Sequence, residues 1–228
     1  MLQKTRGLVL NFLRYRETSV IVHIYTEEFG IQSYIENGVR SSKGRNKAAL
    51  FQPLTLLDLV VYHKEKGGIQ RLSEVKISHP FHSIPFEFAK SSIGLFLTEM
   101  LSKTLKEETS NPPLFNFLTD SVLWLDEATS SYESFHLIFL VKLAAFLGFA
   151  PDSGIEVADQ LRQHGLPIFD DAALRLLDQL TSASYDHPPA LSRSMRSYLL
   201  ELLLKFYELH IDNLGEVKSL AVLQEVMR

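Results

Sequence analysis

The fold of the N-terminal part of this chain is decided by residues 19–36, Ser19-Val-Ile-Val-His-Ile-Tyr-Thr-Glu-Glu-Phe-Gly-Ile-Gln-Ser-Tyr-Ile-Glu36. Val20, Val22 and Ile24 alternate with other side chains, which indicates a β-strand with one buried face. Gly30 then opens a second strand-like segment. Its side chains fall on two faces, one with Ile31, Ser33 and Ile35 and the other with Gln32, Tyr34 and Glu36.

The same period of two extends outward from this stretch. Residues 8–12, 54–62 and 69–77 are further strand-like segments, and turn residues such as Gly67-Gly68 separate them. No helical pattern of any length occurs before about residue 80. Five short strands with tight connections are typical of a small barrel.

Beyond His79-Pro80 the apolar residues follow helical spacing instead. The change occurs near residues 81–85 without a long linker, which favours two parts that pack together. We therefore predict an α+β chain with a barrel domain over residues 1–80 and an all-helical domain over residues 81–228. Helices are expected at about 89–104, 114–125, 135–146, 174–180, 198–209 and 216–226.

The composition limits the classes of protein to consider. With 46% hydrophobic residues among 228, the chain can bury substantial cores. The absence of cysteine excludes disulfides, thiolate zinc sites and cysteine nucleophiles, and it fits a reducing compartment. Cations interrupt the apolar residues near the N-terminus, and the apolar stretch 135–150 is too short to cross a bilayer. We expect a soluble cytoplasmic protein with no membrane partner.

Charge is distributed unevenly along the chain. Residues 1–80 hold 12 Lys and Arg against 7 Asp and Glu, giving +5, and residues 81–228 hold 11 against 20, giving −9. The segment Gly38-Val-Arg-Ser-Ser-Lys-Gly-Arg-Asn-Lys47, here called the basic loop, contains no carboxylate. Its cations suit a phosphate backbone, because neutralising each phosphate releases condensed counterions. The alternative is a solvated hairpin tip. The cations are Arg40, Lys43, Arg45 and Lys47.

Further candidates for nucleic-acid binding lie on the strands. A barrel face can stack bases on aromatic rings while cations follow the phosphates. The competing interpretation is that the tyrosines are ordinary strand residues with a polar tip. The candidates on this face are Arg14, Tyr15, Arg16 and Tyr34, and Lys4 and Arg6 extend the cationic track along the first strand.

Five pieces of the N-terminal part resemble one known family. They are Arg6-Gly-Leu-Val-Leu10, Tyr15-Arg-Glu-Thr-Ser19, Thr26-Glu-Glu-Phe-Gly30, Gly38-Val-Arg-Ser-Ser-Lys43 and Leu50-Phe-Gln-Pro-Leu-Thr-Leu-Leu-Asp58. Their order and gaps are similar to those of the bacterial recombination mediator RecO family. The helical remainder has the right length for that family, with a looser match in sequence.

The resemblance implies an N-terminal OB-fold, a helical domain and a role in DNA repair and recombination. Family members bind single- and double-stranded DNA, anneal complementary strands and act with RecR to load RecA onto strands coated by single-stranded-DNA-binding protein. They also bind the acidic, hydrophobic C-terminal tail of that coating protein. A peptide of this kind suits the helix that carries Arg193, Arg196 and Lys205, although such a stripe is also typical of plain core.

The chain departs from a common feature of the family. Many relatives insert a four-cysteine zinc module that would fall between about Pro151 and Phe169, and this segment contains no cysteine. We expect no metal and no cofactor here, so the segment must either be held by side-chain packing in place of a metal or be mobile. The apolar residues available for this packing are Ile155, Val157, Leu161 and Ile168.

The sequence does not favour an enzyme. His79 and His82 have a spacing that metals use, but no third ligand accompanies them, and Gly67-Gly68 lacks the lysine and helix of a nucleotide-binding loop. We expect a non-catalytic DNA-repair mediator. The rival hypotheses are an RNA-binding OB-fold protein and a protein-interaction scaffold whose basic loop binds an acidic partner.

We predict that the purified protein contains no stoichiometric zinc, because the segment that would replace the zinc module lacks thiolate ligands. Elemental analysis of protein purified without chelators measures this directly. One equivalent of zinc per chain would contradict the prediction.

Overall fold

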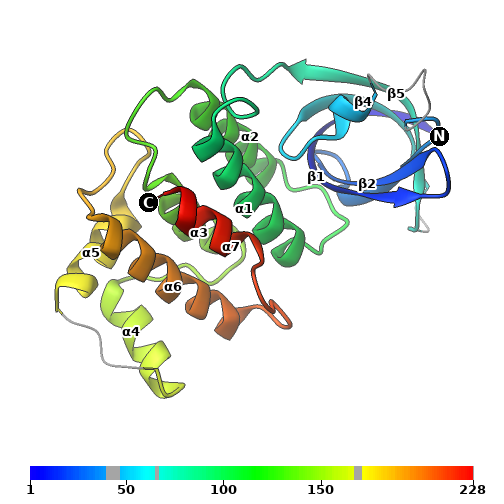
Figure 1. The fold of residues 1–228 in the computed structure, drawn as a ribbon. Helices are drawn as coiled ribbons and strands as arrows, with labels where there is room; N and C mark the ends of the chain where they lie inside the picture. The colour runs from blue at the N-terminus through cyan, green and yellow to red at the C-terminus, as the bar shows by residue number, and fades with distance from the viewer. Residues whose placement is uncertain (40–46, 65–66, 167–170, 228) are drawn as a thin grey trace. The chain divides into compact units, whose positions relative to one another are not determined.

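The structure is a computed structural model that describes residues 1–39, 47–64, 67–166 and 171–227. In these residues the N-terminal part forms a closed five-stranded barrel. The strand order is β1-β2-β3-β5-β4, and Figure 1 shows the barrel beside the helices of the first unit. The barrel expected from the alternating segments is confirmed. The strands are β1 (Leu2–Tyr15), β2 (Ser19–Thr26), β3 (Gly30–Glu36), β4 (Leu56–Tyr62) and β5 (Gln70–His79).

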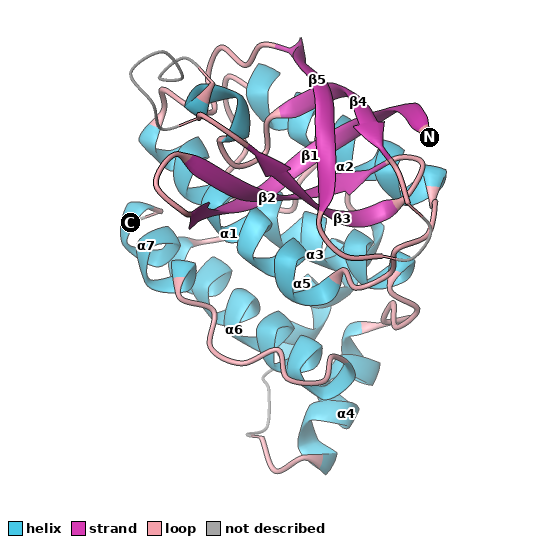
Figure 2. Ribbon diagram, turned by 90° about the vertical axis from the view of Figure 1, so that its right-hand side faces the viewer, coloured by secondary structure: helices cyan, strands magenta, loops and turns pink. Residues whose placement is uncertain are grey.

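Strand β1 is long enough to pair on both of its sides. It is antiparallel to β2 with Leu13 opposite Ile21, and antiparallel to β4 with Thr5 opposite Leu59. A bulge at residues 9–11 interrupts the β1–β2 register, and such a bulge bends a strand as a small barrel requires. A short parallel pairing of β3 with β5 closes the barrel. Figure 2 shows both strands from another side.

The barrel interior is filled by the inward-facing side chains of these strands and of the segments that flank the basic loop. Tyr34 belongs to this interior and is fully buried, because it lies opposite Val22, which also points inward. Its ring therefore offers no face to a base, which corrects the prediction of Tyr34 as a stacking residue. The interior cluster comprises Val9, Val20, Val22, Ile24, Tyr34, Val39, Phe51, Leu57, Leu59 and Val61.

The rest of the described chain is helical, as predicted. It contains one helix that was not predicted from the sequence. That helix, α4, lies in the segment that replaces the zinc module. In the described ranges, no helix combines the length and apolar character that a membrane crossing requires. The helices are α1 (Phe88–Thr104), α2 (Pro112–Glu127), α3 (Phe135–Phe146), α4 (Gly154–Gln163), α5 (Asp171–Ser182), α6 (Arg193–His210) and α7 (Ser219–Val226), with a 3-10 turn η1 (Ala48–Phe51) before β4.

The chain divides into two compact units, residues 1–126 and 127–228. In the first unit α1 packs beside β1 (Figure 1). The Asn11 amide of β1 donates to the Ser102 hydroxyl of α1 at 2.9 Å. The loop after α1 crosses the start of β3, and the Ile31 N–H donates to the Glu107 carbonyl at 3.0 Å. Gly30 has a φ of +60° and its backbone touches this loop, so a side chain here would clash.

Polar side-chain contacts hold α4 in the second unit. The Ser153 hydroxyl caps the helix, and the Gly154 N–H donates to the Asp178 carboxylate of α5 at 2.6 Å. Val157 and Leu161 are buried, as expected. Ile155 is 56% exposed, so its predicted packing role is wrong, because it lies on the outer side of a helix. Ile168 lies outside the described residues.

Two buried tyrosines, one in each unit, differ in whether their hydroxyl has a hydrogen-bond partner. The Tyr34 hydroxyl has no hydrogen-bond partner among the residues that the structure describes, whereas the Tyr207 hydroxyl donates to the Leu140 carbonyl at 2.7 Å. A buried polar group without a partner is destabilising. We predict that Tyr34→Phe raises the free energy of unfolding by about 1 kcal/mol and that Tyr207→Phe lowers it by about 1 kcal/mol, measured by urea denaturation. A loss of stability in Tyr34→Phe would contradict this account.

Candidate nucleic-acid interface

The outward side of β1, β2 and β3 carries a row of apolar side chains. Leu13 lies opposite Ile21, Ile21 lies opposite Ile35, and Ile35 pairs with Arg71 of β5. Leu13 is 57% exposed and the two isoleucines are half-buried. This row, with Arg71 at its end, is here called the outer row. The strand 2–3 face of an OB-fold is the face that binds oligonucleotides in such barrels.

A histidine and a serine lie beside the outer row. The register places His23 opposite Ser33, and the His23 Nδ1 lies 2.9 Å from the Ser33 hydroxyl. Partial burial lowers the pKa of His23, so its imidazole is neutral at pH 7. The pair supplies hydrogen-bonding groups to this face without adding charge.

The turn between β1 and β2 presents cations together with an aromatic ring. Arg14 and Arg16 are exposed, and Tyr15 between them is half-buried. The Arg16 guanidinium carbon lies 5.2 Å from the centre of the Tyr15 ring. Arg16 has a φ of +52°, which the tight turn imposes on it. The predicted residues Arg14, Tyr15 and Arg16 therefore form one cluster at this end of the barrel, here called the turn cluster.

The described ends of the basic loop lie at the same end of the barrel. Arg14 is opposite Val20, and Val20 is opposite Glu36 on β3. The Lys47 ammonium lies 3.0 Å from the Glu36 carboxylate, and Lys47 remains 54% exposed. Lys47 is thus brought close to the turn cluster. The other predicted loop cations, Arg40, Lys43 and Arg45, lie outside the described residues.

Arg6 has a different environment. Its Nε and Nη2 atoms donate to the two oxygens of Glu27 at 2.8 and 2.6 Å, and its guanidinium lies 5.0 Å from the centre of the Phe115 ring. The hydrogen bond raises the pKa of Arg6 and lowers the pKa of Glu27. Arg6 therefore links β1 to the turn after β2 and to α2, and its charge is already neutralised.

Lys4 and Arg6 line an open hollow of about 550 Å³ on the outer side of β1, β4 and β5. Lys76 is the third cation of its lining, and four carboxylates complete it, those of Glu27, Glu28, Asp58 and Glu74. Such a surface does not attract a polyanion strongly. Lys4 and Arg14 are ten residues apart on one strand, roughly 30 Å along its axis. The structure therefore separates Lys4 and Arg6 from the turn cluster.

The three cations proposed for a partner peptide do not form one site either. Arg193 and Arg196 border a hollow of only about 10 Å³, and the Arg196 guanidinium donates to the Leu191 carbonyl at 2.9 Å. Lys205 lies roughly 14 Å further along α6, given the rise of a helix. It borders a separate groove of about 540 Å³ between α6 and α7 and pairs with Glu208 at 2.7 Å.

Comparison with known proteins identifies the family. A family model described as Recombination protein O N terminal matches residues 1–81, and one described as Recombination protein O C terminal matches residues 85–221. The chain belongs to the RecO family. The resemblance inferred from the five N-terminal pieces is confirmed.

Similar proteins match along their whole lengths. The DNA repair protein RecO of Bacteroides fragilis is 39% identical, and that of Phocaeicola vulgatus is 37% identical, each over 99% of both chains. The DNA repair protein RecO of Flavobacterium psychrophilum is 35% identical over 98% of both chains. The chain is therefore a DNA repair protein of the RecO family.

Sequence reasoning missed the outer row, although its signal was present. Once Val20, Val22 and Ile24 are assigned inward, Ile21 must point outward, and an outward isoleucine on a strand is a candidate contact residue. The alternation named Ile35 as part of one face of its strand, but it could not show which face is outward without the register of the neighbouring strands. In the part of the chain that the structure describes, no three His, Asp or Glu side chains gather as a metal site.

We predict that Arg6→Lys keeps the charge but lowers the free energy of unfolding by about 0.5–1 kcal/mol, because lysine cannot form the two-pronged bond to Glu27. Thermal or urea denaturation measures the change. Lys4→Arg is the matched control and should leave stability unchanged. Equal stability of Arg6→Lys and the parent protein would show that Arg6 has no such bracing role.

Proposed function

We propose that this RecO-family protein binds single- and double-stranded DNA through the turn cluster and outer row of its barrel. The observation that carries the proposal is the convergence of Arg14 and Arg16, with the Lys47–Glu36 ion pair beside them, at one end of the barrel, next to exposed apolar side chains. Three further loop cations, Arg40, Lys43 and Arg45, precede Lys47 in the sequence. Cations of this density favour a phosphate backbone over a small ligand.

The cations and the outer row contribute to binding in different ways. The cations neutralise phosphates and release counterions, which gives affinity without sequence preference. Leu13, Ile21 and Ile35 and the ring of Tyr15 supply apolar surface for bases that are not paired in a duplex. The protein therefore binds single strands through both phosphate contacts and base contacts, and it binds duplexes mainly through phosphate contacts.

Strand annealing follows from this mode of binding. Neutralising the phosphates of two strands lowers their mutual repulsion, and a grip without sequence preference lets the strands realign until base pairing succeeds. No bond is made or broken by the protein, so we propose a mediator without catalytic residues or cofactors. Membership of the RecO family supports this role.

We further propose that the chain performs the mediator role implied by its family. It would act with RecR to help load RecA onto strands coated by single-stranded-DNA-binding protein. The groove between α6 and α7 could receive the hydrophobic side chains of that tail, because Leu202 and Leu220 line it. Lys205 and Lys218 also line it, but Glu201, Glu208 and Glu216 offset their charge. The hollow beside Arg193 and Arg196 is too small for a peptide side chain.

The experiment for DNA binding is a titration with oligonucleotides over a range of salt concentrations. We predict a linear fall of log affinity with log salt, and a slope reduced by about 1.5 in Arg14→Ala/Arg16→Ala, since each phosphate contact contributes roughly 0.7–0.9. Replacing all four loop cations, Arg40, Lys43, Arg45 and Lys47, by alanine should weaken binding on every sequence alike.

Lys4→Ala/Lys76→Ala is the matched control, because it removes the same charge from the mixed hollow on the other side of the barrel. It should leave the slope unchanged. Equal losses in the control and in the Arg14/Arg16 variant would reject the assignment of the interface. Preference for RNA over a DNA strand of the same sequence would favour the RNA-binding alternative.

A further inference from the structure

In addition to the outer row and the turn cluster, the first compact unit contains an apolar groove. It has a volume of about 590 Å³ and lies between η1, the end of β5 and the start of α1. We call it the junction groove. The described residues that line it include no Lys, Arg, Asp or Glu. Its main apolar side chains are Pro53, Ile77, Phe81, Pro85, Phe86 and Leu95.

Large apolar side chains are unusually exposed at this groove. Phe86 is 79% exposed, and the neighbouring Phe88 at the start of α1 is 72% exposed. Ile77 and Leu95 are exposed by 41% and 46%. A contiguous exposed apolar patch with rings at its edge marks an interaction site more often than a single exposed leucine does.

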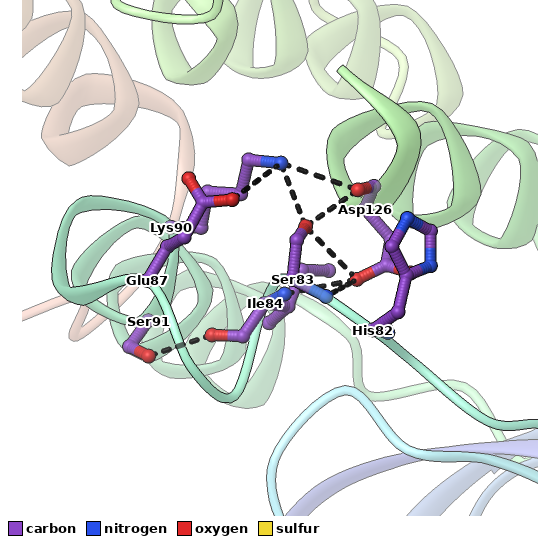
Figure 3. A network of polar contacts seen from close by, with 7 residues as sticks. All are labelled: His82, Ser83, Ile84, Glu87, Lys90, Ser91 and Asp126. Carbon is purple, nitrogen blue, oxygen red and sulfur yellow. Dashed lines mark hydrogen bonds and ion pairs between the residues drawn. The ribbon is translucent and has the colours of Figure 1, made fainter. Parts of the chain in front are cut away.

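The wall that carries Phe86 is held rigidly by a buried carboxylate. Asp126 at the end of α2 accepts hydrogen bonds from the backbone N–H groups of His82, Ser83 and Ile84 at 3.0, 2.9 and 2.9 Å (Figure 3). Burial opposes ionisation of Asp126, but these hydrogen bonds outweigh it and lower its pKa. The carboxylate is therefore charged at neutral pH and fixes the turn that forms the wall.

A buried lysine completes this network. The Lys90 ammonium donates to the Ser83 hydroxyl at 2.6 Å and to the Asp126 carbonyl at 3.2 Å, and the Ser91 hydroxyl donates to the Ile84 carbonyl at 2.6 Å (Figure 3). The Phe86 N–H then donates to the Ser83 carbonyl at 2.9 Å. Phe86 is thus presented on a turn that loses little conformational entropy when a ligand binds.

The opposite wall joins the groove to the proposed DNA interface. Ala49 and Gln52 line the groove, and Lys47 lies two residues before Ala49. Lys47 is exposed and lies at the end of the barrel that carries Arg14. An uncharged groove that carries aromatic rings and adjoins the segment of Lys47 matches the two chemistries of a single strand, which has apolar base faces and anionic phosphates.

We propose that the junction groove binds unpaired bases of single-stranded DNA, with Phe86 and Phe88 as stacking rings. This proposal rests on the proposed function and extends it by a site specific for single strands. A duplex keeps its bases stacked inside and cannot insert them, so the groove adds affinity for single strands alone. An apolar protein segment and a second copy of this chain are the competing occupants.

The test compares Phe86→Ala/Phe88→Ala with the parent protein on an oligothymidine and on a blunt duplex at the same salt concentration. Both side chains are mostly exposed, so the variant should fold. We expect about a tenfold loss of affinity for the single strand, an unchanged salt slope and an unchanged affinity for the duplex. Ile155→Ala, which removes another exposed apolar side chain, is the control and should change neither affinity.

Three outcomes would overturn the proposal. The first is unchanged affinity of the double variant for oligothymidine while Arg14→Ala/Arg16→Ala still lowers the salt slope, which rejects the groove and leaves the proposed function standing. The second is a change in oligomeric state by sedimentation without a change in DNA affinity, which assigns the groove to self-association. The third is a lack of DNA binding by the parent protein at low salt, which rejects both proposals.

A second variant gives a positive signal. Phe86→Trp places an indole at the rim of the groove, and stacking on a base should quench its fluorescence. Quenching by oligothymidine but not by the duplex supports the groove, with the parent protein, which contains one tryptophan, as the background. Equal quenching by both, or by neither, contradicts it.

Discussion

The burial of inward-facing side chains in a closed five-stranded barrel is the constraint on which the rest of the first unit depends. Alternation along each strand means that filling the interior with Val20, Val22 and Tyr34 forces Ile21 and Ile35 outward. Closure by the β3–β5 pairing removes the free edges that an open sheet would expose. The outward rows are therefore the surfaces left for binding, and their composition decides what they bind.

Electrostatics then divides these surfaces. On the side of β1, β4 and β5, Arg6 is neutralised by Glu27, and further carboxylates surround it. At the turn after β1, Arg14 and Arg16 are exposed beside a ring. Among the described cations, Arg14, Arg16 and Lys47 thus lie at one end of the barrel, and the buried carboxylate of Asp126 fixes an apolar wall elsewhere in the same unit.

The sequence predicted the barrel and most of the helices, because alternation and helical spacing report directly on burial. It did not reveal that Tyr34 points inward, since its strand carries apolar residues on both faces and only the register with Val22 decides between them. The α4 helix was not predicted, because Pro151 and Gly154 at its start are typical of a loop and its few apolar residues give a weak helical pattern. Arg6 and Asp126 could not be interpreted from sequence, since their partners Glu27 and Ser83 are 21 and 43 residues away.

The central claim is that polynucleotide contacts gather on the barrel end and the adjoining groove. Hydrogen exchange measured by mass spectrometry, with and without saturating oligothymidine, tests it most directly. The account predicts slower exchange in peptides covering residues 11–23, 33–39, 47–55 and 79–88, and no change in residues 152–165. Protection confined to α4 through α7, with the barrel peptides unchanged, would contradict it.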